Sequence, residues 1–328
     1  MSRREHGLIH KANMYQVILY YKFYPIKDRD GFLKEHQTFC REHNLKGRVY
    51  ISSEGINGTL AGFVEDIVLY KNFLCSKPGF KDTEFKEDKS DDLPFARLKV
   101  KLRPEIVTLK SDVPVDPSRE SAPRISPQEW RETLESQDDF LLIDVRNNYE
   151  SRIGHFEGAV TPDVANFYDF PQWLASSHID KNKKILMYCT GGIRCEKFSL
   201  YMLKKGYKNI SQLQGGIINY AQKEGGARFK GKCFVFDDRL VVGVQPDSVE
   251  PISRCDITGI PCDSYLNCAN IDCNKLFICS AEGARRMEGS CSEACQKSSR
   301  RKPFHPDKIY EPTPRLHTYF KKDNPSPH

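Results

Sequence analysis

The stretch KILMYCTGGIRCE, residues 184–196, constrains the fold of this chain more than any other part of it. Its apolar residues 185–188 predict a buried strand that ends at Cys189, and the sequence after Arg194 is typical of a helix. A tight loop between strand and helix directs backbone N–H groups and the positive helix end toward one point. This arrangement lowers the pKa of a thiol, and the thiolate is its reactive form. We therefore predict that Cys189 is a catalytic nucleophile in an anion-binding loop.

The predicted anion-binding loop contains Thr190, Gly191, Gly192, Ile193, Arg194 and Cys195. Its two glycines allow the backbone to close around the sulfur. Cysteine phosphatases place one more residue between Cys and Arg, so this shorter loop favours a smaller group, such as the outer sulfur of a persulfide. Arg194 either donates hydrogen bonds to a bound anion or locks the loop. Cys195 is expected to pack in the first helical turn, with a role as resolving thiol as the alternative.

The residues around this loop resemble a rhodanese domain, which we place at 125–232. The resemblance rests on four ordered stretches, ISPQEWRETL, LLIDVRNNYESRIGHFEGAV, CTGGIRC and LQGGI. It implies an α/β fold with a doubly wound parallel sheet. Asp144 and Arg146, at the end of a predicted strand, are expected to pair and brace the loop, with a role in substrate binding as the alternative.

The sequence before the linker predicts an α+β domain over residues 1–109. A strand rich in β-branched and aromatic residues comes first, then a helix over 28–43. A hairpin turning near 55–58, a second helix and a last strand over 95–109 complete the order βαββαβ, which is typical of a ferredoxin-like or acylphosphatase-like sheet. Proline-containing residues 110–124 are predicted to be a linker.

Basic residues alternate with apolar ones along the last predicted strand of this domain. Because side chains alternate between the two faces of a strand, the cations share one face. The residues are Arg97, Lys99, Lys101 and Arg103. Two interpretations stay open: a solvated sheet face, and a phosphate-binding surface for RNA.

The C-terminal residues 233–328 form a predicted irregular, Cys-rich segment. Seven of its cysteines fall within 41 residues, a density typical of metal sites. They are Cys255, Cys262, Cys268, Cys273, Cys279, Cys291 and Cys295. Zinc is the metal that this segment would take, but no Cys-x2-Cys pair identifies the ligands. The alternative is a reduced, Cys-rich loop module, and no other cofactor is predicted.

Composition and length indicate the cellular context. A chain of 328 residues is long enough for two or three domains, and no run of about 20 apolar residues predicts a membrane span. The N-terminus lacks the features of a signal peptide, so we expect a cytoplasmic protein in which 12 cysteines stay reduced. The net charge of +6 is compatible with a nucleic-acid partner. No protein partner is predicted.

The whole architecture resembles the bacterial tRNA uridine(34) hydroxylase family. SSEGINGT, CTGGIRCE, LQGGI and the Cys-rich PCD and LFIC stretches contribute to this resemblance. It implies oxygen-dependent 5-hydroxylation of the wobble uridine of tRNA, with O2 as co-substrate and a persulfide-forming Cys189. The chain departs from the family in the tail, where Thr258 and the residues 280–283 replace expected cysteines, and this weakens the case for a metal there.

The residues themselves leave the reaction open. Neither a two-His-one-carboxylate iron site nor a GxGxxG dinucleotide motif explains how oxygen would be activated. The alternative to the hydroxylase is a thiosulfate or persulfide sulfurtransferase. A third hypothesis is a non-catalytic RNA-binding protein that uses the basic face.

Overall fold

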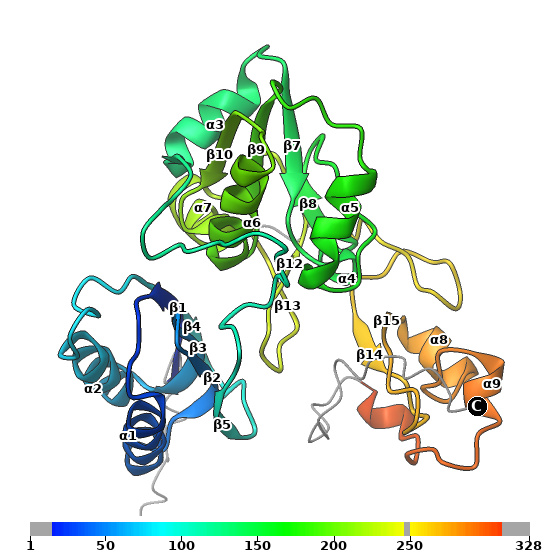
Figure 1. Cartoon of the computed structure of the whole chain (residues 1–328). Coiled ribbons are helices and arrows are strands. Elements are labelled where there is room, and N and C mark those ends of the chain that lie inside the picture. The colour runs from blue at the N-terminus through cyan, green and yellow to red at the C-terminus, as the bar shows by residue number, and fades with distance from the viewer. Residues whose placement is uncertain (1–14, 246–249, 310–328) are drawn as a thin grey trace, which may run out of the picture. The chain divides into compact units, whose positions relative to one another are not determined.

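The computed structural model describes residues 15–245 and 250–309 (Figure 1). The outer ends of the first predicted domain and of the Cys-rich segment, residues 1–14 and 310–328, lie outside this description. Within the described ranges, no helix combines the length and the apolar character that crossing a bilayer requires.

The chain folds into two compact units. The first contains the described residues up to Thr108 together with Asp116–Glu120, and the second contains Leu109–Val115 and the described residues from Ser121 onward. The residues of the predicted linker, 110–124, are therefore divided between the two units.

The first unit is a five-stranded sheet with two helices. Its elements are β1 (Tyr15–Phe23), α1 (Arg29–Glu42), β2 (Lys46–Ser52), β3 (Gly55–Phe63), α2 (Val64–Cys75), β4 (Phe85–Ser90) and β5 (Leu98–Leu102). The sheet order is β4-β1-β3-β2-β5, and β5 pairs with β2 in parallel while the other pairs are antiparallel. The α+β class is as expected, but β4 adds a strand to the predicted order βαββαβ.

Three details of the first unit differ from the sequence prediction. The polar segment FKEDKS of β4 lacks the apolar alternation that marks a strand, and it was not predicted. The hairpin turns at residues 53–54, because Ser52 and Gly55 already pair. The last strand is shorter than 95–109, since it ends at Leu102, two residues before Pro104.

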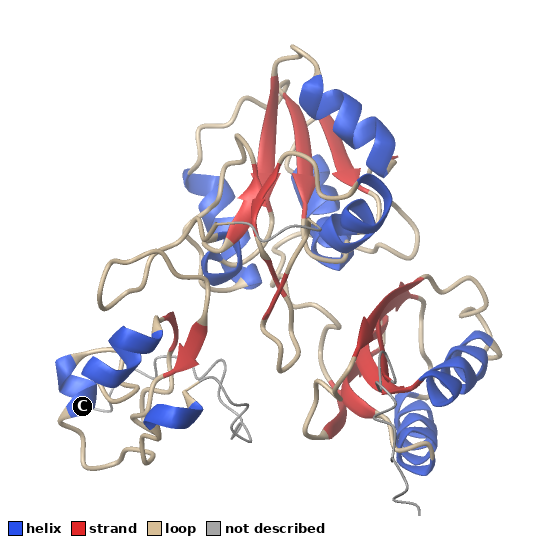
Figure 2. Ribbon diagram, turned by 180° about the vertical axis from the view of Figure 1, so that it is seen from behind, coloured by secondary structure: helices blue, strands red, loops and turns tan. Residues whose placement is uncertain are grey.

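Both helices of the first unit lie on the same side of its sheet (Figure 2). The alternation of the strands sends one set of apolar side chains under the helices, where they are fully or nearly fully buried. They include Ile18, Tyr20, Val49, Ile51, Ile56, Leu60 and Val100. The helix α1 begins after Asp28, whose side chain accepts a hydrogen bond from the Gly31 N–H as an N-cap. The opposite side of the sheet has a smaller apolar cluster, in which Val17 and Ala61 pack with Phe95.

The second unit begins with a parallel α/β domain. Its elements are β6 (Arg124–Ile125), α3 (Pro127–Glu135), β7 (Phe140–Asp144), α4 (Asn148–Ser151), β8 (Gly154–Phe156), η1 (Phe167–Asp169), α5 (Phe170–Ser176), β9 (Lys184–Tyr188), α6 (Ile193–Lys204), β10 (Asn209–Leu213) and α7 (Gly216–Glu224). The four-stranded sheet has the order β6-β10-β9-β7, with every pair parallel. This is the parallel sheet that the sequence predicted.

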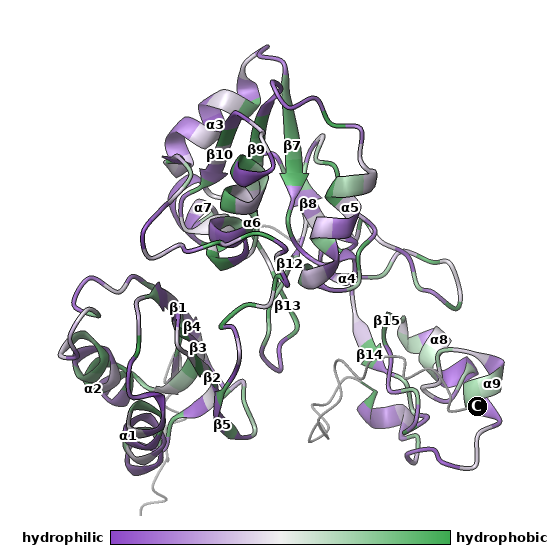
Figure 3. Ribbon diagram, in the orientation of Figure 1, coloured by the Kyte–Doolittle hydropathy of each residue, from purple (hydrophilic) through white to green (hydrophobic). Residues whose placement is uncertain are grey.

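The central strands of this sheet are buried on both faces. Leu142 and Leu186 pack in one cluster with Trp130 of α3, whereas Ile143 and Met187, which face the other way, are also fully buried. In Figure 3 β7 is hydrophobic over most of its length, as expected of a parallel strand covered on both sides. Such burial leaves the carboxyl ends of the strands as the place for polar chemistry.

The remainder of the second unit has little regular structure. Its elements are β11 (Phe229–Gly231), β12 (Cys233–Phe234), β13 (Val241–Val242), β14 (Tyr265–Asn267), β15 (Leu276–Ile278), α8 (Ala281–Arg286), α9 (Glu293–Gln296) and η2 (Pro306–Lys308). The strand β11 pairs with β8, while β12 with β13 and β14 with β15 form two-stranded ribbons. The predicted irregular Cys-rich segment is therefore correct for its described residues.

Candidate active site

Cys189 lies between the end of β9 and the start of α6, as the sequence predicted (Figure 1). Four residues separate it from Arg194. The turn into α6 requires a φ of +104° at Gly192, a backbone conformation that favours glycine. The loop therefore wraps around the Cys189 side chain at the carboxyl end of a parallel strand.

The sulfur of Cys189 is surrounded by hydrogen-bond donors. The Gly192 N–H donates to it over 3.1 Å. Both the backbone N–H and the thiol of Cys195 also donate to it. Of the predicted loop residues, Gly192 and Cys195 therefore direct donors at the sulfur, whereas the Thr190 hydroxyl contacts Glu150 and Arg194.

The pKa of Cys189 is lowered to about 5. Burial alone would raise the pKa, but the hydrogen bond from the Cys195 thiol and the charge of Arg194 outweigh it. The backbone N–H groups of Cys195 and Gly192 lower the pKa further. Burial and the neighbouring Cys189 raise the pKa of Cys195, so Cys195 remains a protonated donor. At neutral pH the pair is a thiolate and a thiol.

Arg194 contacts Glu150 and Thr190 in this structure, as the loop-locking one of its two predicted roles requires. Its guanidinium forms two hydrogen bonds with the carboxylate of Glu150, at 2.5 and 2.8 Å. It also donates to the Thr190 hydroxyl at 3.2 Å, and that hydroxyl donates to Glu150. Glu150 is fully buried, and its negative charge is paired with that of Arg194. The Arg194 charge still lowers the pKa of the nearby Cys189.

Glu150 is a functional residue that the sequence reasoning missed. It lies in the short helix α4, far from the loop in sequence, within the stretch NNYES. The sequence offered only one signal for such a role, a single acidic residue within this stretch. Only the tertiary structure brings its carboxylate to Arg194.

The paired glycines of LQGGI also contribute to the site. A Cβ atom on Gly216 would lie 2.5 Å from the carbonyl oxygen of Cys189 and 2.7 Å from that of Thr190. With glycine there, the Ile217 N–H donates to the Cys189 carbonyl and the Ile218 N–H donates to the Thr190 carbonyl. The start of α7 therefore fixes the outer side of the loop, a role that the sequence alone did not assign.

Asp144 and Arg146 brace the strand below the loop, as predicted. Both side chains are fully buried, and the guanidinium contacts the carboxylate at 2.6 and 2.9 Å. The Tyr188 hydroxyl, on the last residue of β9, donates to Asp144 over 2.9 Å. This pair thus holds the residue that immediately precedes Cys189.

The sulfur-containing loop is enclosed. Cys189 has an exposed fraction of 0%, while Thr190 and Arg194 are exposed by only 5% and 6%. The immediate environment of the sulfur is nonetheless polar, because amides, a thiol and a guanidinium face it.

We expect Cys189 to react with iodoacetamide down to unusually low pH. Because the thiolate is the nucleophile, its alkylation rate should stay near its maximum at pH 6.5 and fall as pH drops through about 5. In the denatured chain the same cysteine should titrate near about 8.5 and react roughly a hundredfold more slowly at pH 6.5 than at its plateau. Mass spectrometry of the Cys189 peptide measures both profiles, and coincident midpoints would contradict the thiolate assignment.

The predicted basic strand lies at the edge of the first unit. Leu98, Val100 and Leu102 pack toward the core, so the four cations occupy the other face. Arg97, Lys101 and Arg103 are exposed, and Lys99 is half-buried.

The neighbouring strand β2 extends this surface. Arg48 pairs in register with Lys99, and Tyr50 with Lys101, so they share its side of the sheet. The Arg103 guanidinium lies 5.2 Å from the centre of the Tyr50 ring. We refer to Arg48, Arg97, Lys99, Lys101 and Arg103 as the basic face.

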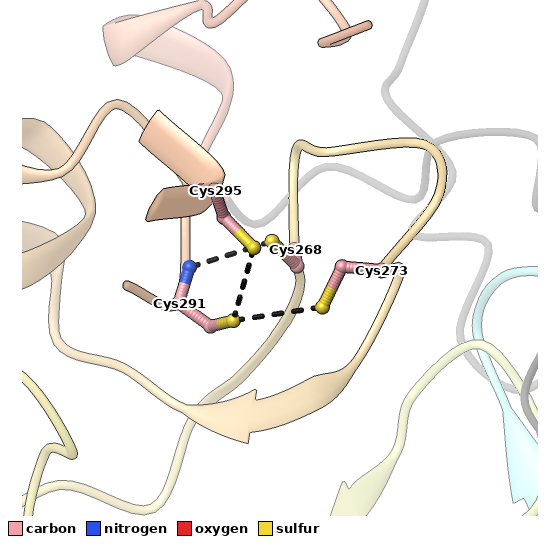
Figure 4. Close-up of side chains that lie close together, drawn as sticks. All are labelled: Cys268, Cys273, Cys291 and Cys295. Atoms are coloured by element: carbon pink, nitrogen blue, oxygen red, sulfur yellow. Dashed lines mark hydrogen bonds between the residues drawn. The ribbon is translucent and has the colours of Figure 1, made fainter. Parts of the chain in front are cut away.

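Four of the tail cysteines come together, although no Cys-x2-Cys pair is present. Cys268, Cys273, Cys291 and Cys295 each place a sulfur within 4.8 Å of the others (Figure 4). Four thiolates at this spacing can bind a metal ion.

Comparison with protein families assigns each part of this architecture. Residues 15–106 match the UPF0176 acylphosphatase-like domain, residues 126–223 the rhodanese-like domain, and residues 230–296 the rhodanese C-terminal domain. The fold and the cysteine loop therefore define a rhodanese-domain protein with an acylphosphatase-like domain before it and a Cys-rich domain after it.

Relatives that match this chain over most of their length identify the family. The chain is 42% identical over 286 residues to the tRNA uridine(34) hydroxylase of Enterococcus faecalis, covering 86% of this chain and 90% of that one. It is 43% identical over 289 residues to the Staphylococcus carnosus protein of the same name, covering 87% and 91%. For the Bacillus licheniformis protein of that name the identity is 40% over 301 residues, covering 91% of each chain. The chain belongs to the tRNA uridine(34) hydroxylase family.

Solved structures match the rhodanese part of the chain. A rhodanese-like domain from Anabaena is 23% identical, with a TM-score of 0.29, and covers 34% of this chain and 80% of that one. A rhodanese-like domain protein from Staphylococcus aureus is 23% identical, with a TM-score of 0.27, and covers 30% and 91%.

Proposed function

We propose that this protein hydroxylates C5 of uridine 34 in tRNA, with the Cys189 thiolate as its nucleophile and O2 as co-substrate. The observation that carries the proposal is its similarity, along nearly its full length, to relatives named for this activity. The ionised sulfur in the loop supplies the chemical group that the reaction needs. Because tRNA is the substrate, the cytoplasm is the compartment of the reaction.

The thiolate activates the base by addition. Its electron pair forms an S–C6 bond with uridine, and the electrons of the C5=C6 double bond move toward the C4 carbonyl. C5 thereby becomes electron-rich and reacts with an oxidant. After the hydroxyl is installed, C5 loses its proton and the S–C6 bond breaks, which restores the double bond and the Cys189 thiolate.

The oxygen balance requires a reductant. One atom of O2 becomes the C5 hydroxyl and the other becomes water, so each turnover consumes two electrons and two protons. A low-molecular-weight thiol is a reductant of the right class, because two such molecules release two electrons and two protons when they form a disulfide.

The basic face is proposed as the tRNA-binding surface of the first unit. It combines exposed guanidinium and ammonium groups with the Tyr50 ring, and these suit phosphates and bases respectively. Within residues 15–245 and 250–309, neither Arg97, Lys101 nor Arg103 forms an ion pair with a carboxylate.

A sulfurtransferase is the second candidate, supported by one observation. The loop has the length that suits a persulfide, and its N–H groups face the sulfur. This candidate predicts rapid cyanide-dependent production of thiocyanate from thiosulfate. Failure of thiosulfate to form a persulfide on Cys189 would count against it.

The decisive test is to express this chain in a bacterium that lacks its own family member. We expect the wobble-position 5-hydroxyuridine derivatives of its tRNA to reappear, as measured by mass spectrometry of tRNA nucleosides. Persistent absence of these nucleosides, with the protein soluble and abundant, would refute the hydroxylase proposal. Thiocyanate formation from thiosulfate and cyanide by the purified protein would then favour the sulfurtransferase.

A further inference from the structure

The four sulfurs of the tail cluster come from two separate segments of the chain (Figure 4). Cys268 and Cys273 lie in the connection between β14 and β15, and Cys291 and Cys295 lie around the start of α9. The close-up shows all four side chains directed toward a common centre. Within residues 15–245 and 250–309, this is the one group of three or more such ligand residues whose donor atoms converge.

The distances between the sulfurs fit a single tetrahedral ion. A Zn–S bond is ~2.3 Å, so two thiolates of one tetrahedral zinc lie about 3.8 Å apart. The Cys273 and Cys291 sulfurs are 3.7 Å apart, and those of Cys291 and Cys295 are 3.9 Å apart. A disulfide would need a separation near ~2.0 Å. An iron–sulfur cluster would hold its thiolates farther apart, because several irons lie between them.

Polar groups near the sulfurs are oriented as donors to thiolates. The Cys291 N–H donates to the Cys268 sulfur over 3.4 Å, and the Asn270 side-chain amide donates to the Cys295 sulfur over 3.5 Å. Such hydrogen bonds hold the ligands in place and reduce the charge on each sulfur.

The segment with Arg300, Arg301 and Lys302 holds the loop that contains Cys268 and Cys273. The Lys302 N–H donates to the Ala269 carbonyl, and the Ile271 N–H donates to the Arg300 carbonyl. These backbone contacts fix the loop beside the four sulfurs.

The fold of the tail explains why an ion is needed. β14 and β15 have three residues each, α8 has six and α9 has four. Elements this short form few hydrogen bonds with one another, so an ion that joins their connecting loops would add stability.

We propose that Cys268, Cys273, Cys291 and Cys295 bind one structural Zn²⁺ ion. With four protein thiolates the ion has no open position for a substrate, so its role is to join the β14–β15 loop to the α9 segment. The site is independent of the proposed tRNA chemistry.

The other three of the seven tail cysteines, Cys255, Cys262 and Cys279, do not form such a converging group within the described residues. The sulfur of Cys255 accepts hydrogen bonds from the Ser280 N–H at 3.3 Å and the Ser280 hydroxyl at 3.4 Å. The Thr258 N–H adds another at 3.4 Å, and the Thr258 hydroxyl lies 3.3 Å from that of Ser280. A Cβ on Gly283 would lie 2.8 Å from the Cys255 sulfur, so glycine fits closely there. The Cys255 sulfur is thus held by hydroxyl and amide donors.

Metal analysis of the full chain tests the proposal. Wild-type protein purified with a reductant should contain about one zinc per chain by inductively coupled plasma mass spectrometry. Cys268→Ser and Cys291→Ser should each lose most of this zinc. Cys262→Ala removes a buried thiol from the same module and should keep it. Co²⁺ substituted into the wild type should give the visible absorption of a tetrahedral four-sulfur site, and the Cys291→Ser variant should not.

Measurements on the wild type keep the test independent of how well the variants fold. A mercurial reagent that titrates thiols should release the zinc in proportion to about four of them, as followed with a colorimetric chelator. Wild-type protein with no stoichiometric zinc, or with iron in its place, would overturn the assignment. So would equal zinc loss in Cys262→Ala and in the two serine variants.

Discussion

Cys189→Ser is expected to lower wobble 5-hydroxyuridine in tRNA by roughly a hundredfold or more, since it removes the nucleophile. The serine hydroxyl is close in size to the thiol and can still accept the Gly192 N–H, so the loop should keep its shape. The serine hydroxyl stays protonated at neutral pH, however, whereas the Cys189 thiol, with its pKa of about 5, is ionised there. The measurement is nucleoside mass spectrometry of tRNA from a strain whose only family member is the variant.

The control for this experiment is Cys75→Ser. Cys75 is partly exposed on α2 in the first unit, so its substitution changes a thiol without touching the loop. It should leave 5-hydroxyuridine at the wild-type level. Full hydroxylation by Cys189→Ser at equal protein abundance would exclude a nucleophilic role and leave the loop with a structural one.

Arg97→Gln together with Lys101→Gln is expected to weaken tRNA binding roughly tenfold to a hundredfold at low salt. Both side chains are exposed on the basic face, and each phosphate contact releases condensed counterions. The plot of log affinity against log salt should therefore lose about two units of slope if both residues contact phosphates. Fluorescence anisotropy with labelled tRNA at several salt concentrations measures both quantities.

A double variant with the same loss of charge provides the comparison. Lys34 lies on α1, which covers the opposite side of the sheet, and Lys27 lies in the loop before it. Lys27→Gln with Lys34→Gln should change the slope and the affinity much less. If both double variants behave alike, net charge rather than the basic face accounts for binding.

The sequence predicted the chemistry of the loop because that chemistry is local. A strand, a cysteine, two glycines and a helix follow one another without interruption, so backbone geometry alone brings N–H groups to the sulfur. The pairing of Asp144 with Arg146 was equally accessible, because two residues at the end of a strand are close in any fold. The helix over residues 28–43 followed from its apolar spacing.

The sequence could not assign partners that arrive from distant segments. Glu150 reaches Arg194 across 44 residues, and Gly216 touches the loop from the start of α7. Arg48 belongs to the basic face only because β5 pairs with β2 in a register that places it beside Lys99. The sequence did not predict β4, because this polar edge strand has no apolar alternation. Hydrogen bonds to β1 stabilise it instead.

The sequence alone determined that Cys189 sits in a rhodanese-type loop, since consecutive residues set the path of the backbone there. The tertiary structure alone decided that Glu150 neutralises Arg194 and that four of the tail cysteines meet while Cys255 does not join them. The physical reason is the range of the interactions. Backbone direction is fixed within a few residues, whereas ion pairs and metal ligands depend on where the packing of the core places remote side chains.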